Sequence, residues 1–273
     1  MYGNHALGEA AILGGCQCYF GYPITPQNEL TEYMAQNMPR VPDGVFIQSE
    51  SEIAAINMVL GASVAGKRAM TSSSSPGISL KQEGISFLAA SELPAVIVNV
   101  VRGSPGLGNI APAQSDYFQA TRGGGHGDYR TIVLAPASVQ EMADLTMLAF
   151  DLADEYRNPV LILTDGMLGE MMETMAWSER QPRNFTRDWA LGGAENRERR
   201  LLISAPLTDR ELIELNIELN KKYKEMAAKE RRWEEFYLED AEVVVVAFGT
   251  TSRIALEAVD EARKKGIKAG MIR

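Results

Sequence analysis

The sequence is poor in cysteine, because Cys16 and Cys18 are the only two in 273 residues. They alternate along a short apolar segment, so in a strand their side chains point to opposite faces of the sheet. This arrangement disfavours a disulfide or a shared metal ion, and we expect two buried, hydrophobic thiols. Because an iron–sulfur cluster normally needs four thiolates, the chain cannot carry a cluster of its own.

Long apolar runs and surplus positive charge are missing as well. No run reaches the roughly 20 apolar residues of a membrane helix, and the first residues lack the basic stretch and apolar core of a signal peptide. The net charge of -9 and the pI of about 5.0 argue against nucleic acid or an anionic membrane as a partner. The dense basic run at residues 197–200 is interrupted by Glu198 and fits a solvated face. We therefore expect a cytoplasmic protein.

What the sequence does contain is an alternation of apolar, β-rich runs and helix-period segments over its first 165 residues. Short runs that are almost wholly apolar are typical of parallel strands covered on both faces. The pattern predicts an α/β fold with a doubly wound parallel sheet, which we assign to residues 1–178. The expected strands are Cys16–Phe20, Arg68–Ser72, Ala95–Val101, Thr131–Leu134 and Val160–Leu163, and the expected helices include Glu52–Ala65 and Val139–Glu155.

After residue 178 the pattern predicts an irregular linker and then a long amphipathic helix, together spanning residues 179–239. The helix is expected at Thr208–Tyr237, where Thr208 and Glu211 fit a capping box. Apolar side chains from Leu212 to Trp233 recur at helical spacing, so this helix needs a surface to pack on.

Residues 240–273 predict the first β-α-β unit of a second α/β domain. A buried-type strand is expected at Glu242–Phe248, a helix at Ser252–Lys265 and another strand at Ile267–Ile272. A unit this short cannot close a core by itself, so we expect the sequence to be truncated at Arg273.

The most informative motif is GYPITP at Gly21–Pro26, between a predicted strand and the helix-like run Gln27–Met38. Open α/β sheets bind ligands in the crevice at the carboxyl ends of their strands. Two prolines flank Ile24 and Thr25 and restrict the backbone. The motif therefore predicts a Thr25 side chain held rigidly at this edge, and a proline-rich turn leading into a helix is the alternative.

Two charged side chains fall at comparable places. Glu52 begins a predicted helix, where the helix dipole stabilises a carboxylate. Arg102 directly follows the predicted strand Ala95–Val101, so its guanidinium is expected level with Thr25, where it can bind a carboxylate through two parallel hydrogen bonds. A structural first-turn glutamate and a surface ion pair are the respective alternatives.

The turn Ser72–Ser75 precedes Pro76, Gly77 and a helix start, a place where hydroxyls and amides can cradle phosphate. It lacks the P-loop pattern, since no lysine follows the turn until Lys81, and an ordinary serine-rich loop is the alternative. The glycines of Gly103–Asn109 match no dinucleotide fingerprint, and the following Pro112 opposes the helix that NAD binding requires.

These motifs together resemble the alpha-type subunits of the 2-oxoacid:ferredoxin oxidoreductases in order and spacing. The stretches that carry the resemblance are GYPITP, IQSESEIAAINMVLGASVAGKRAM (Ile47–Met70), TSSSSPGISLKQEG (Thr71–Gly84), PAVIVNVVRGSPGLGN (Pro94–Asn109) and GGGHGDYR (Gly123–Arg130). The resemblance covers essentially the whole chain and is greatest to subunits of 2-oxoisovalerate (3-methyl-2-oxobutanoate) and 2-oxoglutarate enzymes. It implies a thiamine diphosphate pyrimidine-binding domain at residues 1–178 and the start of a transketolase C-terminal-like domain at residues 240–273.

The resemblance also assigns roles to individual residues. It implies that Glu52 is catalytic and contacts the aminopyrimidine of thiamine diphosphate, with Glu50 as the fallback, and that Thr25 and Arg102 bind the 2-oxoacid. Cofactor contacts are further implied for Ile24, Ser74 and Ser75, and additional candidates are Asn109 and His126, although a loop histidine is more often structural.

The implied function is coenzyme A-dependent oxidative decarboxylation of a 2-oxoacid, either 2-oxoisovalerate or 2-oxoglutarate. Asp165-Gly166 resembles the magnesium motif of thiamine enzymes, but the Asp-Asn oxygen ligands are missing. Mg²⁺ and the diphosphate are therefore expected on a beta-type subunit, and 4Fe-4S clusters that reduce ferredoxin on iron–sulfur and gamma-type subunits. A non-catalytic scaffold subunit and a cluster-free thiamine diphosphate decarboxylase or transketolase-like enzyme are the alternatives.

Overall fold

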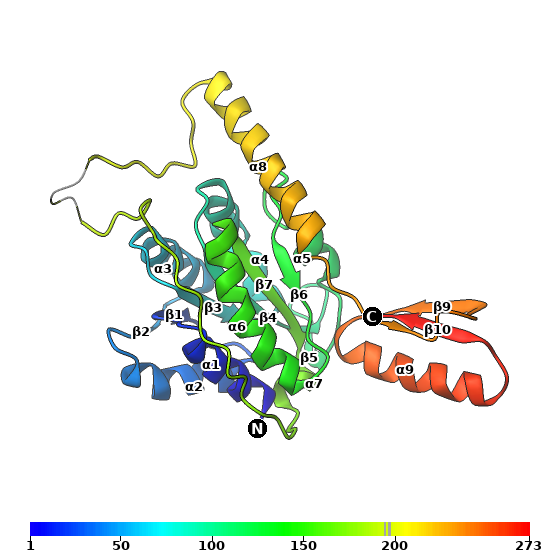
Figure 1. Ribbon diagram of the computed structural model, residues 1–273. Coiled ribbons are helices and arrows are strands. Elements are labelled where there is room, and N and C mark those ends of the chain that lie inside the picture. The colour runs from blue at the N-terminus through cyan, green and yellow to red at the C-terminus, as the bar shows by residue number, and fades with distance from the viewer. Residues whose placement is uncertain (194, 196–197) are drawn as a thin grey trace.

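A computed structural model describes residues 1–193, 195 and 198–273 of the chain (Figure 1). In this part of the chain the main sheet has seven strands. Six are parallel in the order β2-β1-β3-β4-β7-β6, and β5 is antiparallel to β4. Their bounds are β1 (Cys18–Gly21), β2 (Val45–Gln48), β3 (Ala69–Ser73), β4 (Ala95–Gly103), β5 (Asn109–Pro112), β6 (Ile132–Leu134) and β7 (Pro159–Asp165).

Helices cover both faces of this sheet, as Figure 1 shows. Alternate residues of β4 face different layers: Val96 and Val98 pack in the cluster with α1, α2 and α6, whereas Ile97 packs with α3 and α4. The doubly wound parallel sheet predicted from the apolar runs is thus confirmed. The helices are α1 (Gly3–Leu13), α2 (Asn28–Asn37), the 3-10 helix η1 (Met38–Arg40), α3 (Glu52–Val64), α4 (Ser75–Ala90), α5 (Tyr117–Arg122), α6 (Val139–Tyr156) and α7 (Gly166–Glu170).

Both cysteines are buried and free, as predicted. Cys16 packs in the cluster with α1 and Cys18 in the cluster with α3, so the two thiols do face opposite sides of the sheet. Cys16 nevertheless lies before β1 rather than within it, since the strand begins at Cys18.

The strand order reverses at β1, which places the crevice of the sheet beside it. The chain leaves β1 for β2 on one side and then crosses to β3 on the other. In open α/β sheets ligands bind at such a point, outside the carboxyl ends of the strands. The loops that follow β1, β2, β3 and β4 all reach this edge, because these strands are parallel.

An ionic cluster holds the irregular segment after β7 against the domain. Arg68 is buried and pairs with Asp151 at 3.0 Å and Asp154 at 2.7 Å, both on α6. Arg180 and Arg187 of the irregular segment complete the cluster, each with a nitrogen 2.6 Å from one of these carboxylates. The segment runs as irregular chain, as predicted, although residues 194, 196 and 197, including the start of the basic run, lie outside the described residues.

The predicted long helix is shorter than expected. Helix α8 (Asp209–Lys229) begins with the capping box of Thr208 and Glu211, as predicted, but ends eight residues before Tyr237. The chain must become extended here, because Glu235–Phe236 form strand β8 against β10. Trp233 therefore lies outside the helix, contrary to the prediction.

Only the second half of the apolar stripe on α8 is buried. Leu219 and Met226 pack against the first domain, whereas Leu212 is 48% exposed. Among the described residues, every helix is too short or too polar to cross a lipid bilayer.

The second sheet has the order β8-β10-β9, with α9 (Gly249–Lys264) beside it, β9 at Val243–Val246 and β10 at Ala269–Ile272. The prediction of a buried-type strand at Glu242–Phe248 was wrong, because every residue of β9 is exposed. The small core of this unit lies between α9 and β10, around Val259 and Met271, and β9 is at the edge of the sheet.

Candidate active site

Four chain segments meet at the carboxyl edge of the main sheet. Residues 22–26 follow β1, residues 49–52 follow β2, Ser74 follows β3, and Arg102 is near the end of β4. Each segment lies where a strand passes into a loop or helix, so its polar side chains lie at the same edge of the sheet. The residues that the sequence singled out from four separate motifs therefore share one crevice.

Thr25 and Arg102 are in direct contact. The Arg102 Nη1 donates a hydrogen bond of 3.0 Å to the Thr25 carbonyl oxygen, and Nη2 donates one of 2.9 Å to the carbonyl of Leu107. The Thr25 hydroxyl accepts only a long bond of 3.4 Å from Asn28 Nδ2. The buried guanidinium thus fixes the GYPITP loop.

The Nε of Arg102 is buried and has no hydrogen-bond partner among the described residues. Buried donors are almost always satisfied in folded proteins, so an unpaired N–H marks a place where an acceptor is expected. Ser75 fixes the backbone of Arg102, because the Ser75 hydroxyl accepts a hydrogen bond of 3.1 Å from the Arg102 amide. A carboxylate is a suitable acceptor for the open side of the guanidinium.

Glu52 is the buried carboxylate of the crevice, whereas Glu50 is exposed. Helix α3 begins at Glu52 because Ser51 is its N-cap, with its hydroxyl accepting a bond of 3.2 Å from the Ala54 amide. None of the described residues donates a hydrogen bond to the Glu52 carboxylate. The burial of Glu52 agrees with the choice of this residue over Glu50, although its role stays a prediction.

Gly77 leaves a space next to this carboxylate. A Cβ added at Gly77 would lie 2.6 Å from Glu52 Oε1 and 2.0 Å from Ser73 Oγ. Any larger residue at this position would therefore displace the two polar groups. The absence of a side chain lets helix α4 approach Glu52 closely.

The serine turn is buried, and this differs from the open phosphate-binding loop that the sequence suggested. Ser72 is used structurally, since its hydroxyl lies 2.6 Å from Tyr19 Oη and donates to Gln27. The hydroxyls of Ser73 and Ser74 are buried without any hydrogen-bond partner. Unsatisfied hydroxyls beside an unpaired carboxylate fit a polar ring system better than they fit a packed protein interior.

Lys81 is a site residue that the sequence reasoning missed, because a lysine on a helix is normally solvated. It is fully buried on α4, one turn after Gly77. Its Nζ donates to Thr71 Oγ1 at 2.9 Å and to the Glu52 carbonyl oxygen at 3.5 Å. Burial lowers the pKa of Lys81 to about 7, against an opposing effect of the Glu52 charge.

Other candidates lie at or beyond the rim. Ile24 is half-buried next to Thr25. Asn109 is exposed on β5, where its Oδ1 accepts a bond of 3.0 Å from the Ala111 amide. His126 is exposed and packs edge-on against Phe87, three turns along α4 from Ser75, so the structure does not bring it to the crevice.

The described residues provide no cluster of His, Cys, Asp and Glu that could hold a metal ion. Asp165, from the motif that resembles a magnesium site, instead caps helix α7 by accepting a bond of 3.1 Å from the Leu168 amide. This carboxylate therefore has a structural use that does not require a metal.

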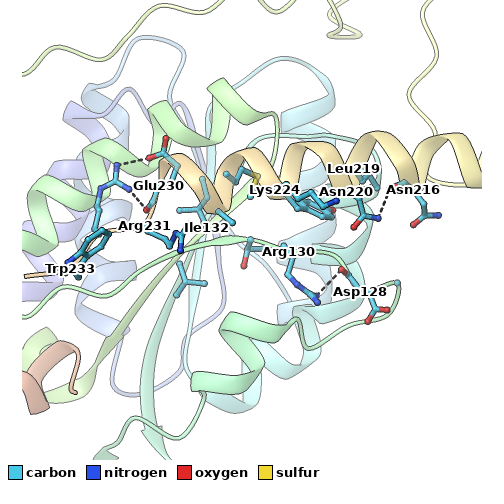
Figure 2. A pocket seen from close by; sticks show the side chains of 17 residues that line it. Asp128, Arg130, Ile132, Asn216, Leu219, Asn220, Lys224, Glu230, Arg231 and Trp233 are labelled. Atoms are coloured by element: carbon cyan, nitrogen blue, oxygen red, sulfur yellow. Dashed lines mark hydrogen bonds and ion pairs between the residues drawn. The ribbon is translucent and has the colours of Figure 1, made fainter. Parts of the chain in front are cut away.

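A large groove of about 1040 Å³ lies elsewhere, between α8 and residues 127–133. Figure 2 shows Asn220 and Lys224 of α8 on one side of this groove and Asp128 and Arg130 on the other. None of the predicted site residues lines it. The crevice, rather than this groove, is the candidate site.

Comparisons with known families agree with this placement. The family model described as "Pyruvate flavodoxin/ferredoxin oxidoreductase, thiamine diP-bdg" matches residues 9–239. The family model "Pyruvate:ferredoxin oxidoreductase core domain II" matches residues 241–273. The first of these matches takes in every residue of the crevice.

Individual relatives point the same way. The ketoisovalerate oxidoreductase subunit VorB of Methanothermobacter marburgensis is 55% identical over 99% of this chain and 77% of its own length. The 2-oxoglutarate synthase subunit KorA of Methanocaldococcus jannaschii is 37% identical over 100% of this chain and 81% of its own length.

A solved structure extends the comparison to three dimensions. The 2-oxoglutarate:ferredoxin oxidoreductase from Magnetococcus marinus, with 2-oxoglutarate, coenzyme A and succinyl-CoA bound, superposes with a TM-score of 0.86 and 29% identity. The match covers 100% of this chain and 52% of the solved one, so the chain spans about half of that protein. By family match, identity and fold, the chain belongs to the 2-oxoacid:ferredoxin oxidoreductases and carries their thiamine diphosphate-binding domain.

Proposed function

We propose that this chain supplies the pyrimidine side of a thiamine diphosphate site in an enzyme that oxidatively decarboxylates a 2-oxoacid. Coenzyme A takes the acyl group, and ferredoxin takes the electrons. The observation that carries the proposal is the buried residue Glu52, whose carboxylate accepts no hydrogen bond from the described residues, at the same sheet edge as the Nε of Arg102, which has no partner among them. A carboxylate without a partner is available to a ring nitrogen, and a guanidinium with an open side is available to a substrate carboxylate.

In this proposal the residues of the chain bind, orient and exchange a proton. Bound thiamine diphosphate would supply the nucleophilic carbon and the electron sink for decarboxylation. Glu52 would donate a proton from its carboxyl group to a nitrogen of the aminopyrimidine and accept it again later in the reaction. Arg102 and the Thr25 hydroxyl orient the 2-oxoacid, while Ile24, Ser74 and Ser75 line the cofactor side.

The preferred substrate is 2-oxoisovalerate. The VorB relative is 55% identical to this chain, whereas the KorA relative is 37% identical, so the branched-chain enzymes are the better guide. 2-Oxoglutarate is the second candidate, supported by the bound ligand of the superposed structure. Reduction of methyl viologen by the complete complex, with each 2-oxoacid offered in turn, distinguishes the two.

The remaining parts of the reaction are assigned to partner subunits. A beta-type subunit supplies Mg²⁺ and the diphosphate half of the site, because Asp165 is used as a helix cap. Iron–sulfur and gamma-type subunits supply the 4Fe-4S clusters that reduce ferredoxin, since the thiols of Cys16 and Cys18 are both buried. We also propose a cytoplasmic complex, and functional boundaries at residues 1–178, 179–239 and 240–273, with Asn109 contributing at the rim.

The substitution Glu52→Gln tests the proposal. An amide cannot hold the exchanged proton, so we expect turnover by the assembled complex to fall on the order of 10² to 10⁴-fold without loss of assembly. Glu50→Gln is the matched control, because Glu50 is exposed two residues earlier, and it should keep most of its activity. Retained activity in Glu52→Gln, with loss in Glu50→Gln, would contradict the assignment.

A further inference from the structure

Lys81 is an unusual neighbour for a catalytic carboxylate. Its side chain has no solvent exposure, and its nitrogen lies between the Thr71 hydroxyl and the Glu52 carbonyl oxygen, which are both neutral acceptors. Among the described residues, no carboxylate oxygen lies within the 4 Å of an ion pair. Glu52 is the charged group that acts on this ammonium, through its side chain on the facing helix α3.

The stability of the fold does not explain why residue 81 is a lysine. Burial disfavours the charged form of a lysine, and here it lowers the pKa of Lys81 to about 7. The ammonium also lies beside the first residue of α3, where the helix dipole is positive and repels a cation. A methionine, one atom shorter than lysine and uncharged, would fill most of this space without either penalty, and apolar replacements of buried charges are often stabilising.

We propose that Lys81 is a positioning residue that stabilises the ionised form of the Glu52 carboxylate. The inference rests on the proposed function, in which Glu52 exchanges a proton with the cofactor. Coupling between two charges is reciprocal, so the free energy by which Glu52 keeps Lys81 protonated is the free energy by which Lys81 keeps Glu52 ionised.

The position of Lys81 determines which protonation state of Glu52 the coupling favours. Gly77 brings α4 against the Glu52 carboxylate, and Lys81 follows one turn later beneath the same residue. The cation therefore favours the state in which Glu52 has handed over its proton. The Thr71 hydroxyl accepts a hydrogen bond of 2.9 Å from the ammonium and so holds it in place.

The first test measures the coupling in the purified chain without cofactor. Lysines carrying ¹³C at the ε carbon are titrated by NMR, and the Lys81 signal is identified by its loss in Lys81→Met. We expect Lys81 to titrate near pH 7 and, in Glu52→Gln, one to two pH units lower, about the effect of one charge across a protein interior. Glu50→Gln should leave the signal unmoved. An equal midpoint in wild type and Glu52→Gln would overturn the proposal.

The second test uses the assembled complex. Lys81→Met should lower kcat about tenfold to a hundredfold, the equivalent of one to two pH units, with KM for the 2-oxoacid little changed. The ratio of wild-type to variant kcat should be largest below pH 7 and shrink as Lys81 loses its proton at higher pH. Thr71→Val keeps the charge and removes a contact, so an equal loss of kcat in that variant would overturn the proposal.

The proposed function and the proposed role of Lys81 can be refuted separately. If Glu52→Gln is active, the proposed function fails, whatever the titration of Lys81 shows. If Glu52→Gln is inactive while Lys81→Met keeps full kcat at pH 6.5, the proposed function stands and the role of Lys81 is wrong.

Discussion

Replacing Lys81 with methionine should make the folded chain more stable at neutral and mildly acidic pH. The folded state holds an ammonium group in a site without solvent exposure, whereas the unfolded chain holds it in water. The pKa of the group falls from an ordinary 10.5 to about 7, and burial is the main cause. Methionine is unbranched like lysine, is one atom shorter and carries no charge.

The magnitude follows from this change in pKa. A fall from 10.5 to about 7 corresponds to a destabilisation of about 5 kcal/mol, present in full below pH 7. The Thr71 hydroxyl loses its partner in the variant, which costs about 1 to 2 kcal/mol. We therefore expect Lys81→Met to be more stable by about 3 kcal/mol at pH 6.5. Above pH 7 the folded wild type releases the proton and the unfolded chain does not, so this advantage should shrink steadily toward pH 10.5.

Urea denaturation at a series of pH values, followed by circular dichroism, measures the difference. Lys221→Met is the matched control, because Lys221 is an exposed lysine on α8 paired with Glu218. That variant should change stability by less than about 0.5 kcal/mol at every pH. A Lys81→Met chain that is less stable than wild type at pH 6.5, or whose advantage does not vary with pH, would refute the reasoning.

Two further outcomes are expected. Arg102→Lys should raise KM for the 2-oxoacid about tenfold to a hundredfold, because lysine loses one of two aligned hydrogen bonds to the carboxylate, worth about 1.5 to 3 kcal/mol. Steady-state kinetics, with the cofactor affinity measured alongside, tests this. An unchanged KM with weaker cofactor binding would contradict it. Asp151→Asn should destabilise the chain by about 3 to 5 kcal/mol at pH 7, because Arg68 loses a buried partner. Burial raises the pKa of Asp151, but Arg180, Arg183 and Arg68 together hold it below its ordinary 3.8. The difference in unfolding free energy between wild type and variant, measured by urea denaturation, should therefore shrink as the pH falls below about 4. A difference that persists at pH 2 would contradict the ionic explanation.

The parts of the fold that the sequence predicted are those in which local pattern and tertiary environment agree. The core strands are apolar because both of their faces are covered, and the residue after each strand is placed by the strand itself. This is why the sequence alone could assign Thr25 and Arg102 to one edge of the sheet, whereas Glu52 was brought to the site only by the family resemblance. The capping box of Thr208 was equally readable, because it depends on residues three apart.

What could not be predicted depends on contacts between distant segments. Val243–Val246 have the composition of a buried strand, but they lie at the edge of a small sheet. The end of α8 is set by the pairing of β8 with β10, about 35 residues later. Lys81 is followed by Gln82 and Glu83 on its helix, and only its contacts with α3 and β3 show that it is buried.

The crevice also has a consequence for folding. Thr25, Glu52, Ser75 and Arg102 enter it from four successive strands, so every contact among them joins residues far apart in the chain. Contacts of this kind form late, because the chain entropy of closing each loop is lost before they can stabilise anything. The contact between Arg102 and Thr25 therefore reports the assembly of β1, β3 and β4 rather than the formation of any single βα unit.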